Sequence, residues 1–357
     1  MKGCSPPSDP DAGIRPPARP YADASPGGGQ TLTFAVHQFY FGTRDPETDQ
    51  QDPAAWKRIG FDVDQRCTTF QDAGFTSPTC KPPAKLETYL DDGDKCRDNN
   101  FGKYSSNLLS INAKFEPTAN QRIDDGYPTM IVQLDDVGMD SCDPHAPGRV
   151  YIAAQHDPLL GTLGWDGTDA REVDSRSVLP DGGLKAPRLA FPKGYITDDT
   201  WVSGEIDAST QPLILPLGAY LFELHASALV LTMKLSKDRK KVESSTIFAV
   251  VSPDELIAAV GPAAISFVGC AASPVVDAVI QSLKQYSDLS SDAGSFQDPT
   301  RACDLISFAM GLEWKAVQAP TKVVTPPVVP LPCDGGLPDG SGGSGGTAGS
   351  PADAGPG

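Results

Sequence analysis

The sequence lacks a long apolar run and is poor in basic residues. No stretch approaches the roughly 20 consecutive apolar residues that a membrane-spanning helix needs. Lys and Arg number 29 against 46 Asp and Glu, which gives a net charge of −17 at pH 7. Because nucleic acid is a polyanion, this balance disfavours nucleic-acid binding, and we expect no nucleic-acid partner.

Motifs of catalysis are also missing. The cysteines form no CxxC pair and the four histidines form no HExxH or HxH pattern, which argues against zinc-ribbon, thioredoxin and zincin chemistry. Matches to GxSxG and GxGxxG occur only within residues 340–346, in a glycine-rich stretch with no strand before it and no helix after it. We therefore assign no catalytic residue and no organic cofactor.

Cysteine is the first informative feature that is present. Several of the eight cysteines lie beside Asp, Gly or Pro in loop-like sequence, which is typical of structural disulfides in an oxidising compartment. Proximity in the sequence favours the pairs Cys67–Cys80, Cys270–Cys303 and the longer link Cys96–Cys142, although sequence alone does not fix connectivity. Cys4 and Cys333 remain, and they can pair with each other if Cys4 is unmodified.

Both ends of the chain are low in complexity. Residues 1–30 and 333–357 are rich in Pro, Gly, Ser and Asp, and such segments bury too little apolar surface to become ordered. We predict a disordered tether over 1–30, one β-rich domain over 31–332 and a disordered tail over 333–357. Gly3-Cys4 resembles the end of a bacterial lipobox. This resemblance predicts a lipid on Cys4, an export signal upstream of Met1 and no other membrane contact.

The central region shows mainly strand patterns. Residues 31–41 are aromatic and β-branched. Residues 227–236 alternate, and residues 245–251 can pair with that stretch across the basic turn 237–241. Residues 306–315 alternate most strictly, which predicts one buried and one solvated face. A capping box at 252–255 and apolar spacing beyond 273 indicate a small helical insert near residues 252–287. The fold class we predict is an antiparallel β-sandwich with this insert.

The sharpest local signal is the acidic segment LDDGDKCRDNNFG, residues 90–102. Calcium takes six to eight oxygen ligands, and the segment offers six Asp and Asn side chains, with Gly93 to allow a turn. We predict Asp91, Asp94, Asp98 and Asn100 as calcium ligands, in a loop that a disulfide at Cys96 would fix. The segment departs from an EF-hand, because no Glu closes it. Alternatively it is a solvated turn leading into a helix, with Asn99 or Asn100 as the cap.

Two tryptophans in loop-like sequence leave a binding role open. Trp165 and Trp201 are flanked by acidic residues and could stack on a sugar ring, although tryptophan in a β-sandwich more often fills the core. The cysteine, the tether, the β-rich body and the acidic segment together resemble cell-envelope lipoproteins of myxobacterial-type genomes. That resemblance implies no particular activity. We therefore expect an exported, lipid-anchored, non-catalytic envelope protein that binds a glycan or another envelope component. A secreted, glycosidase-like hydrolase using loop carboxylates is the alternative.

Overall fold

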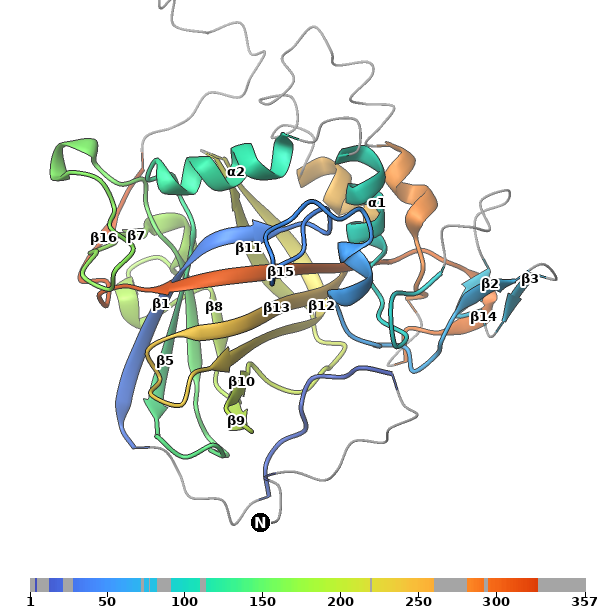
Figure 1. The fold of residues 1–357 in the computed structure, drawn as a ribbon, viewed down its shortest axis with the longest axis horizontal. Coiled ribbons are helices and arrows are strands. Elements are labelled where there is room, and N and C mark those ends of the chain that lie inside the picture. The colour runs from blue at the N-terminus through green and yellow to red at the C-terminus, as the bar shows by residue number, and fades with distance from the viewer. Residues whose placement is uncertain are drawn as a thin grey trace, which may run out of the picture.

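The computed structural model describes residue 4 and residues 13–21, 28–71, 74–76, 78–81, 91–109, 114–218, 220–259, 281–291 and 295–326. Within them the chain is mainly β, as predicted. Figure 1 shows a large curled sheet with helices α1 and α2 along one side. The predicted tail at 333–357 and Cys270 lie outside the described residues.

One antiparallel sheet of ten strands organises the molecule. Its strand order is β8-β6-β5-β1-β15-β13-β12-β10-β9, and β11 pairs with β12 beside this path. The bounds are β1 Gln30–Tyr40, β5 Met130–Val137, β6 Gly148–Ile152, β8 Leu189–Phe191, β9 Tyr195–Thr197, β10 Thr200–Val202, β11 Gln211–Leu217, β12 Tyr220–Leu235, β13 Val242–Val251 and β15 Ile306–Ala316. Strands from near the two ends of the described chain, β1 and β15, are therefore neighbours at the centre of the sheet.

Smaller elements complete the fold. Three two-stranded sheets join β2 Thr69–Gln71 to β3 Gly74–Thr76, β4 Cys80–Lys81 to β14 Asp298–Ala302, and β7 Val173–Asp174 to β16 Val323–Val324. The helices are α1 Asn100–Leu109 and α2 Phe115–Asp124, with 3-10 turns η1 Ala55–Arg58, η3 Pro158–Leu160, η4 Ser175–Ser177, η5 Gly183–Lys185 and η7 Ser282–Tyr286. Residues 253–259 are also helical, where the capping box predicted a start.

The sheet curls so that strands near its two ends face each other across a shared core. Phe191 of β8 and Trp201 of β10 meet edge to face with ring centroids 6.1 Å apart, although their strands lie far apart in the strand order. The inner face contributes Phe34, Leu134 and Leu231 to a continuous apolar core. This enclosure of one core between two parts of the same sheet gives the fold its sandwich-like character.

The outer face of the central strands is also covered, contrary to the expectation for residues 306–315. Residues 306–312 of β15 are buried on both faces. Ala309, on the outer side, packs in a second apolar cluster with Phe61, Val63 and Phe248. The alternation in β15 arises because the small residues Ser307, Ala309 and Gly311 face this second layer. The layer itself is built from segments that are distant in sequence, such as the one with Phe61 and Val63.

Three disulfides join described residues, and none is a predicted pair. They are Cys4–Cys142, Cys67–Cys96 and Cys80–Cys303. The predictions Cys67–Cys80, Cys96–Cys142 and Cys270–Cys303 are therefore wrong. Strand pairing decides the matter, because β4 and β14 lie in parallel and bring Cys80 beside Cys303, across 223 residues of sequence.

The N-terminal segment departs from a free tether. Residues 13–21 lie on the body, where Arg19 donates hydrogen bonds to the carbonyls of Pro144 and Lys193. The hydroxyl of Tyr195 donates to the carbonyl of Pro17 at 2.7 Å. In addition, the sulfur of Cys4 is in a disulfide, and a sulfur so bonded cannot also carry the thioether of a lipid anchor. Residues 13–21 therefore pack on the body, and the Cys4–Cys142 disulfide uses the same sulfur atom as the predicted lipid.

Trp201 is a core residue and not a surface platform. Its side chain is fully buried, and its indole Nε1 donates to the carbonyl of Ala146 at 2.7 Å. The ring also lies against Gly148, where a Cβ would come within 2.5 Å of the indole. The prediction of a ligand platform at this position is wrong, because Trp201 fills the space where the curled sheet closes.

We expect Trp201→Ala to lower the free energy of unfolding by about 3 to 5 kcal/mol, the usual cost of emptying a large aromatic site in a core. Urea unfolding followed by far-UV circular dichroism measures this directly. Exposed Leu159→Ala serves as the control and should change stability little. An unchanged midpoint for Trp201→Ala would show that the ring does not pack in the core.

Candidate metal centre

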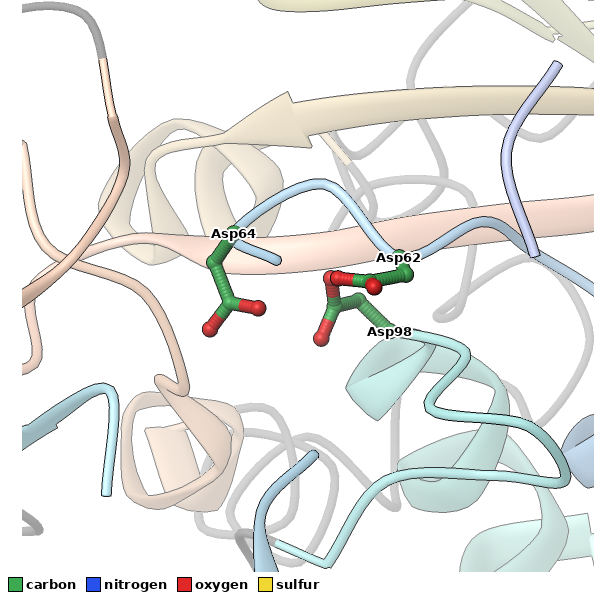
Figure 2. Close-up of side chains that lie close together, drawn as sticks. All are labelled: Asp62, Asp64 and Asp98. Carbon is green, nitrogen blue, oxygen red and sulfur yellow. The ribbon is translucent and has the colours of Figure 1, made fainter. Parts of the chain in front are cut away.

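Three aspartates meet beneath the surface on the outer side of the sheet. Figure 2 shows the carboxyl groups of Asp62, Asp64 and Asp98 turned toward one another. One carboxylate oxygen from each lies within 4.8 Å of the other two. Their exposed fractions are 4%, 1% and 2%, so all three are removed from bulk water.

Alternation in a short extended segment places two of these side chains. Phe61 and Val63 pack in the outer apolar cluster. Successive side chains of an extended chain point to opposite sides. Asp62 and Asp64 therefore lie on the same side of the segment, away from the sheet. The apolar residues thus anchor the segment, and the aspartates between them are held at fixed positions.

Backbone pairing brings the third side chain. The amide of Asp98 donates to the carbonyl of Phe61 at 3.0 Å, and the amide of Val63 donates to Asp98 Oδ2 at 2.7 Å. Asp98 is followed by Asn99, whose Oδ1 accepts from the amide of Gly102 at 3.0 Å and so caps helix α1. The start of α1 therefore fixes Asp98 against the segment that carries Asp62 and Asp64.

The hydrogen bonds of the cluster are incomplete. Asp64 accepts from the amide of Arg66 at 2.9 Å and from the hydroxyl of Thr79. By contrast, Asp62 Oδ1 is buried and has no hydrogen-bond partner within the described part of the chain. A buried carboxylate oxygen without a partner costs free energy, which a ligand at this point would recover.

The charge of the cluster also lacks a direct ion pair within the described part of the chain, although the positive charges of Arg15 and Arg66 act on Asp62 and Asp64 from a greater distance. Among the described residues no ion pair involves Asp62, Asp64 or Asp98. Arg66 lies close in sequence, but its guanidinium donates to Gln297 and to the carbonyl of Pro78. Three buried carboxylates in this state must hold protons or a cation.

Burial shifts their pKa values accordingly. Burial, with the charge of Asp64 next in importance, raises the pKa of Asp62 to about 6. Burial also raises the pKa of Asp64 above its ordinary value, and it raises that of Asp98 well above, with Asp64 as the largest charge contribution there. Carboxylates stabilised by hydrogen bonds or positive charge have low pKa values. The raised pKa values here show that the ionised carboxylates are destabilised, so the site favours binding of a proton or a cation.

Two more aspartates of the same region interact electrostatically with Asp64. Burial raises the pKa of Asp92 to about 9 and that of Asp288 to about 7, with the charge of Asp64 contributing to both shifts. Asp92 accepts from the amide of Thr68 at 2.6 Å, and Asp288 accepts from the amide of Ser307 at 2.8 Å. These hydrogen bonds hold the two carboxyl groups in place, and the raised pKa values mean that protons neutralise much of their charge near pH 7.

Gly13 brings the N-terminal segment directly onto the cluster. A Cβ at this position would lie 2.0 Å from Asp62 Oδ2, so only glycine permits so close an approach. The next residue, Ile14, accepts from the amide of Asp62 at 2.7 Å and donates to the carbonyl of Lys95 at 3.1 Å. The N-terminal segment therefore covers the side of the cluster that Asp62 occupies.

The donor set fits a hard cation. The three residues offer carboxylate oxygens and neither imidazole nor thiolate, which suits calcium, magnesium or manganese better than zinc or copper. Calcium tolerates irregular arrangements of oxygen and accepts bidentate carboxylates, whereas magnesium demands a regular octahedron and retains its waters. Asp62, Asp64 and Asp98 are the residues that could hold such an ion.

Only one of the four predicted calcium ligands belongs to this cluster. Asp98 is a member, whereas Asp94 is exposed and Asp91 is partly exposed. Asn100 is buried at the start of α1, where its amide Nδ2 donates to the carbonyl of Tyr286 at 3.0 Å. The segment is thus a disulfide-bonded turn that leads into helix α1, with Asn99 as the cap and Asp98 turned inward.

Sequence reasoning missed Asp62 and Asp64. The available signal was Asp62-Val63-Asp64, two acidic residues alternating with the apolar residues Phe61 and Val63. That pattern indicates a strand-like segment with one apolar and one acidic face. Nothing in it reveals that the acidic face is buried.

Trp165, the other predicted platform, is half-buried. Its ring lies edge-on to His37, with centroids 4.9 Å apart, and packs against two apolar clusters. Its backbone has a φ of 53°, which is uncommon for a bulky residue, and its amide donates to Asp169 Oδ2 at 2.6 Å. Trp165 lies apart from the aspartate cluster and retains some exposed surface.

Comparison with models of known protein families, with curated proteins and with solved structures finds no match for this chain. In the part of the chain that the structure describes, no helix has the length and apolar character to cross a membrane. The cluster must therefore be interpreted from its own chemistry.

The cluster predicts an unusual dependence of stability on pH. The folded pKa values of Asp62 and Asp288, about 6 and 7, lie above the ordinary value of 3.8, so the folded state binds more protons than the unfolded state between these limits. In a chelating buffer, the contribution of these two groups to the free energy of unfolding should be fully present below about pH 4. It should be lost as the pH rises through their folded pKa values of about 6 and 7. Calorimetric Tm values at a series of pH values test this.

The matched control for the pH series is the variant Asp62→Asn, in which one raised group is absent. Its Tm should decline less between pH 5 and pH 7 than that of the natural sequence. A parallel decline in both proteins would contradict the assignment of this dependence to Asp62.

Proposed function

We propose that this chain is an exported, non-catalytic cell-envelope protein with a binding role, held together by disulfides and by a structural calcium ion at Asp62, Asp64 and Asp98. The observation that carries the calcium assignment is the buried and unpartnered Oδ1 of Asp62 beside two further buried carboxylates. A divalent cation would satisfy this oxygen and neutralise most of the charge in one step.

The ion's role would be structural because of what the cluster connects. Asp62 and Asp64 belong to the layer over the outer face of the sheet, Asp98 precedes α1, and Gly13 belongs to the N-terminal segment. An ion here links segments that share few backbone hydrogen bonds. Its removal leaves three carboxylates that repel one another or must take up protons.

Export is supported by the disulfides. Six cysteines of the described residues are in three disulfides, and such bonds persist in oxidising compartments. Calcium is abundant outside the cytosol, where sites of modest affinity are occupied. The proposal therefore retains the cell envelope as the location, and it does not include a lipid on Cys4.

The hydrolase alternative is less well supported by this cluster. A carboxylate that acts on a glycan must reach the glycosidic bond. Asp62, Asp64 and Asp98 are at most 4% exposed, which suits the holding of an ion and not contact with a polymer. A glycan or another envelope component remains the proposed binding partner, and Trp165 is the candidate contact that still has exposed surface.

Calcium should stabilise the protein measurably. At free calcium one hundred times its Kd, binding to the folded state alone adds about 2.7 kcal/mol, which corresponds to a rise in Tm of roughly 5 °C. Calorimetry of the chelator-treated protein, followed by titration with calcium and separately with magnesium, measures this rise. Calcium is expected to act at lower concentration than magnesium.

Two variants separate this site from the exposed loop. Asp62→Asn should abolish the calcium-dependent rise in Tm, whereas Asp94→Asn, which alters an exposed residue of the same acidic region, should leave it intact. If calcium produces no shift in the metal-free natural protein, the proposed ion is wrong. If Asp94→Asn abolishes the shift and Asp62→Asn does not, the site lies in the loop 91–100.

A further inference from the structure

Two of the three disulfides border the aspartate cluster. Cys67–Cys96 joins the segment that carries Asp62 and Asp64 to the segment that carries Asp92 and Asp98. The third disulfide, Cys4–Cys142, joins the N-terminal segment to the loop after β5 and connects no two carboxylate-bearing segments of the cluster. Removal of Cys67–Cys96 can therefore be compared with removal of Cys4–Cys142 as a control.

Cys67–Cys96 lies within a short antiparallel arrangement of two segments. At one end the amide of Asp98 donates to the carbonyl of Phe61, and at the other the amide of Asp92 donates to the carbonyl of Thr68 at 3.0 Å. The disulfide joins these segments between the two hydrogen bonds, with its Cα atoms 4.6 Å apart. The amide of Val63 also donates to Asp98 Oδ2, so these hydrogen bonds and the disulfide together set the spacing between Asp64 and Asp98.

Cys80–Cys303 supports the other side of the cluster. Thr79, which donates its hydroxyl to Asp64, directly precedes Cys80. The sulfur of Cys80 lies 3.1 Å from the carbonyl oxygen of Asp288. This second bond is buried, whereas Cys67 is exposed, so a reductant reaches Cys67–Cys96 first.

From this arrangement we propose that the cation site is redox-dependent: the oxidised Cys67–Cys96 disulfide holds Asp62, Asp64 and Asp98 at ligand spacing, and its reduction releases the ion. The inference rests on the proposed calcium site. Its physical basis is preorganisation, since an ion that must first order two separate loops binds more weakly than one that meets them already joined.

The chemical step is ordinary thiol–disulfide exchange. A dithiol reductant transfers two electrons and two protons to Cys67–Cys96, which breaks the S–S bond and leaves two thiols, while the reductant becomes a disulfide. No ligand of the site changes its covalent structure. The affinity changes because Asp98 and the pair Asp62 and Asp64 are no longer joined through the short crosslink.

The first experiment compares affinity in three proteins by calorimetric titration with calcium. We expect Cys67→Ser/Cys96→Ser to bind about tenfold or more weakly than the natural, oxidised protein, in line with the loss of a preorganising crosslink. Cys4→Ser/Cys142→Ser should bind with unchanged affinity. Equal affinity of the natural protein and Cys67→Ser/Cys96→Ser overturns the redox inference and leaves the calcium site standing.

A second experiment uses only the natural protein, so it decides the question even if the variant fails to fold. Because coupling between two equilibria is reciprocal, calcium must oppose the reduction of Cys67–Cys96 by the same factor by which reduction weakens calcium binding. The protein is equilibrated with dithiothreitol at graded concentrations, and the free thiols are trapped and located by peptide mass spectrometry.

Saturating calcium should raise the dithiothreitol concentration that half-reduces Cys67–Cys96 by about tenfold or more, as the reciprocal coupling requires. Cys4–Cys142 should show no such change. If calcium binds but leaves the reduction of Cys67–Cys96 unaltered, the redox inference is wrong. If the oxidised natural protein binds no calcium, the proposed calcium site itself fails.

Discussion

Three carboxylates share a space from which water is excluded and in which no basic side chain of the described residues pairs with them. The segments that surround the cluster, over the outer face of the sheet, must accommodate this charge. The amide of Val63 donates to the carboxyl group of Asp98, and the amide of Arg66 and the Thr79 hydroxyl donate to that of Asp64. None of them supplies positive charge, so the arrangement is complete only with protons or a cation.

The sheet makes this layer possible by being buried on both faces. Its inner face encloses the main core, and its outer face at β13 and β15 carries the second apolar cluster, on which Phe61 and Val63 rest. The layer itself has only short strands, such as β4 with two residues and β14 with five. Disulfides therefore replace the ladder hydrogen bonds that longer strands would provide, and two of them lie beside the cluster.

The same arrangement separates two kinds of stabilisation. The strands β1, β5, β12, β13 and β15 are held by continuous pairing and apolar burial, which depend little on solution conditions. The cluster, by contrast, would depend on protons, on the proposed cation and on the oxidation state of Cys67 and Cys96. Loss of the proposed ion would therefore loosen the layer with Asp62 and Asp98 while the curled sheet persists, because none of the three aspartates takes part in the pairing of these strands.

Most of the sheet could be predicted from the sequence, and the site could not. Alternation over residues 306–315 and 227–236 predicted β15 and the second half of β12, and the capping box predicted the helical start at 253. The predicted calcium ligands named Asp98 but missed Asp62 and Asp64, which lie more than thirty positions earlier in the chain. The cysteine pairs failed for the same reason, since Cys80 finds Cys303 only through the pairing of β4 with β14.

The sequence by itself determined the strands, the helix caps and the abundance of cysteine and acid, because side-chain periodicity and capping act between residues a few positions apart. Tertiary structure alone decided which cysteines bond, that Trp201 fills the core and that residues 13–21 lie against the body. It also decided which acids are buried together. Burial depends on what the rest of the chain places over a residue, and such contacts between distant segments leave no local pattern in the sequence.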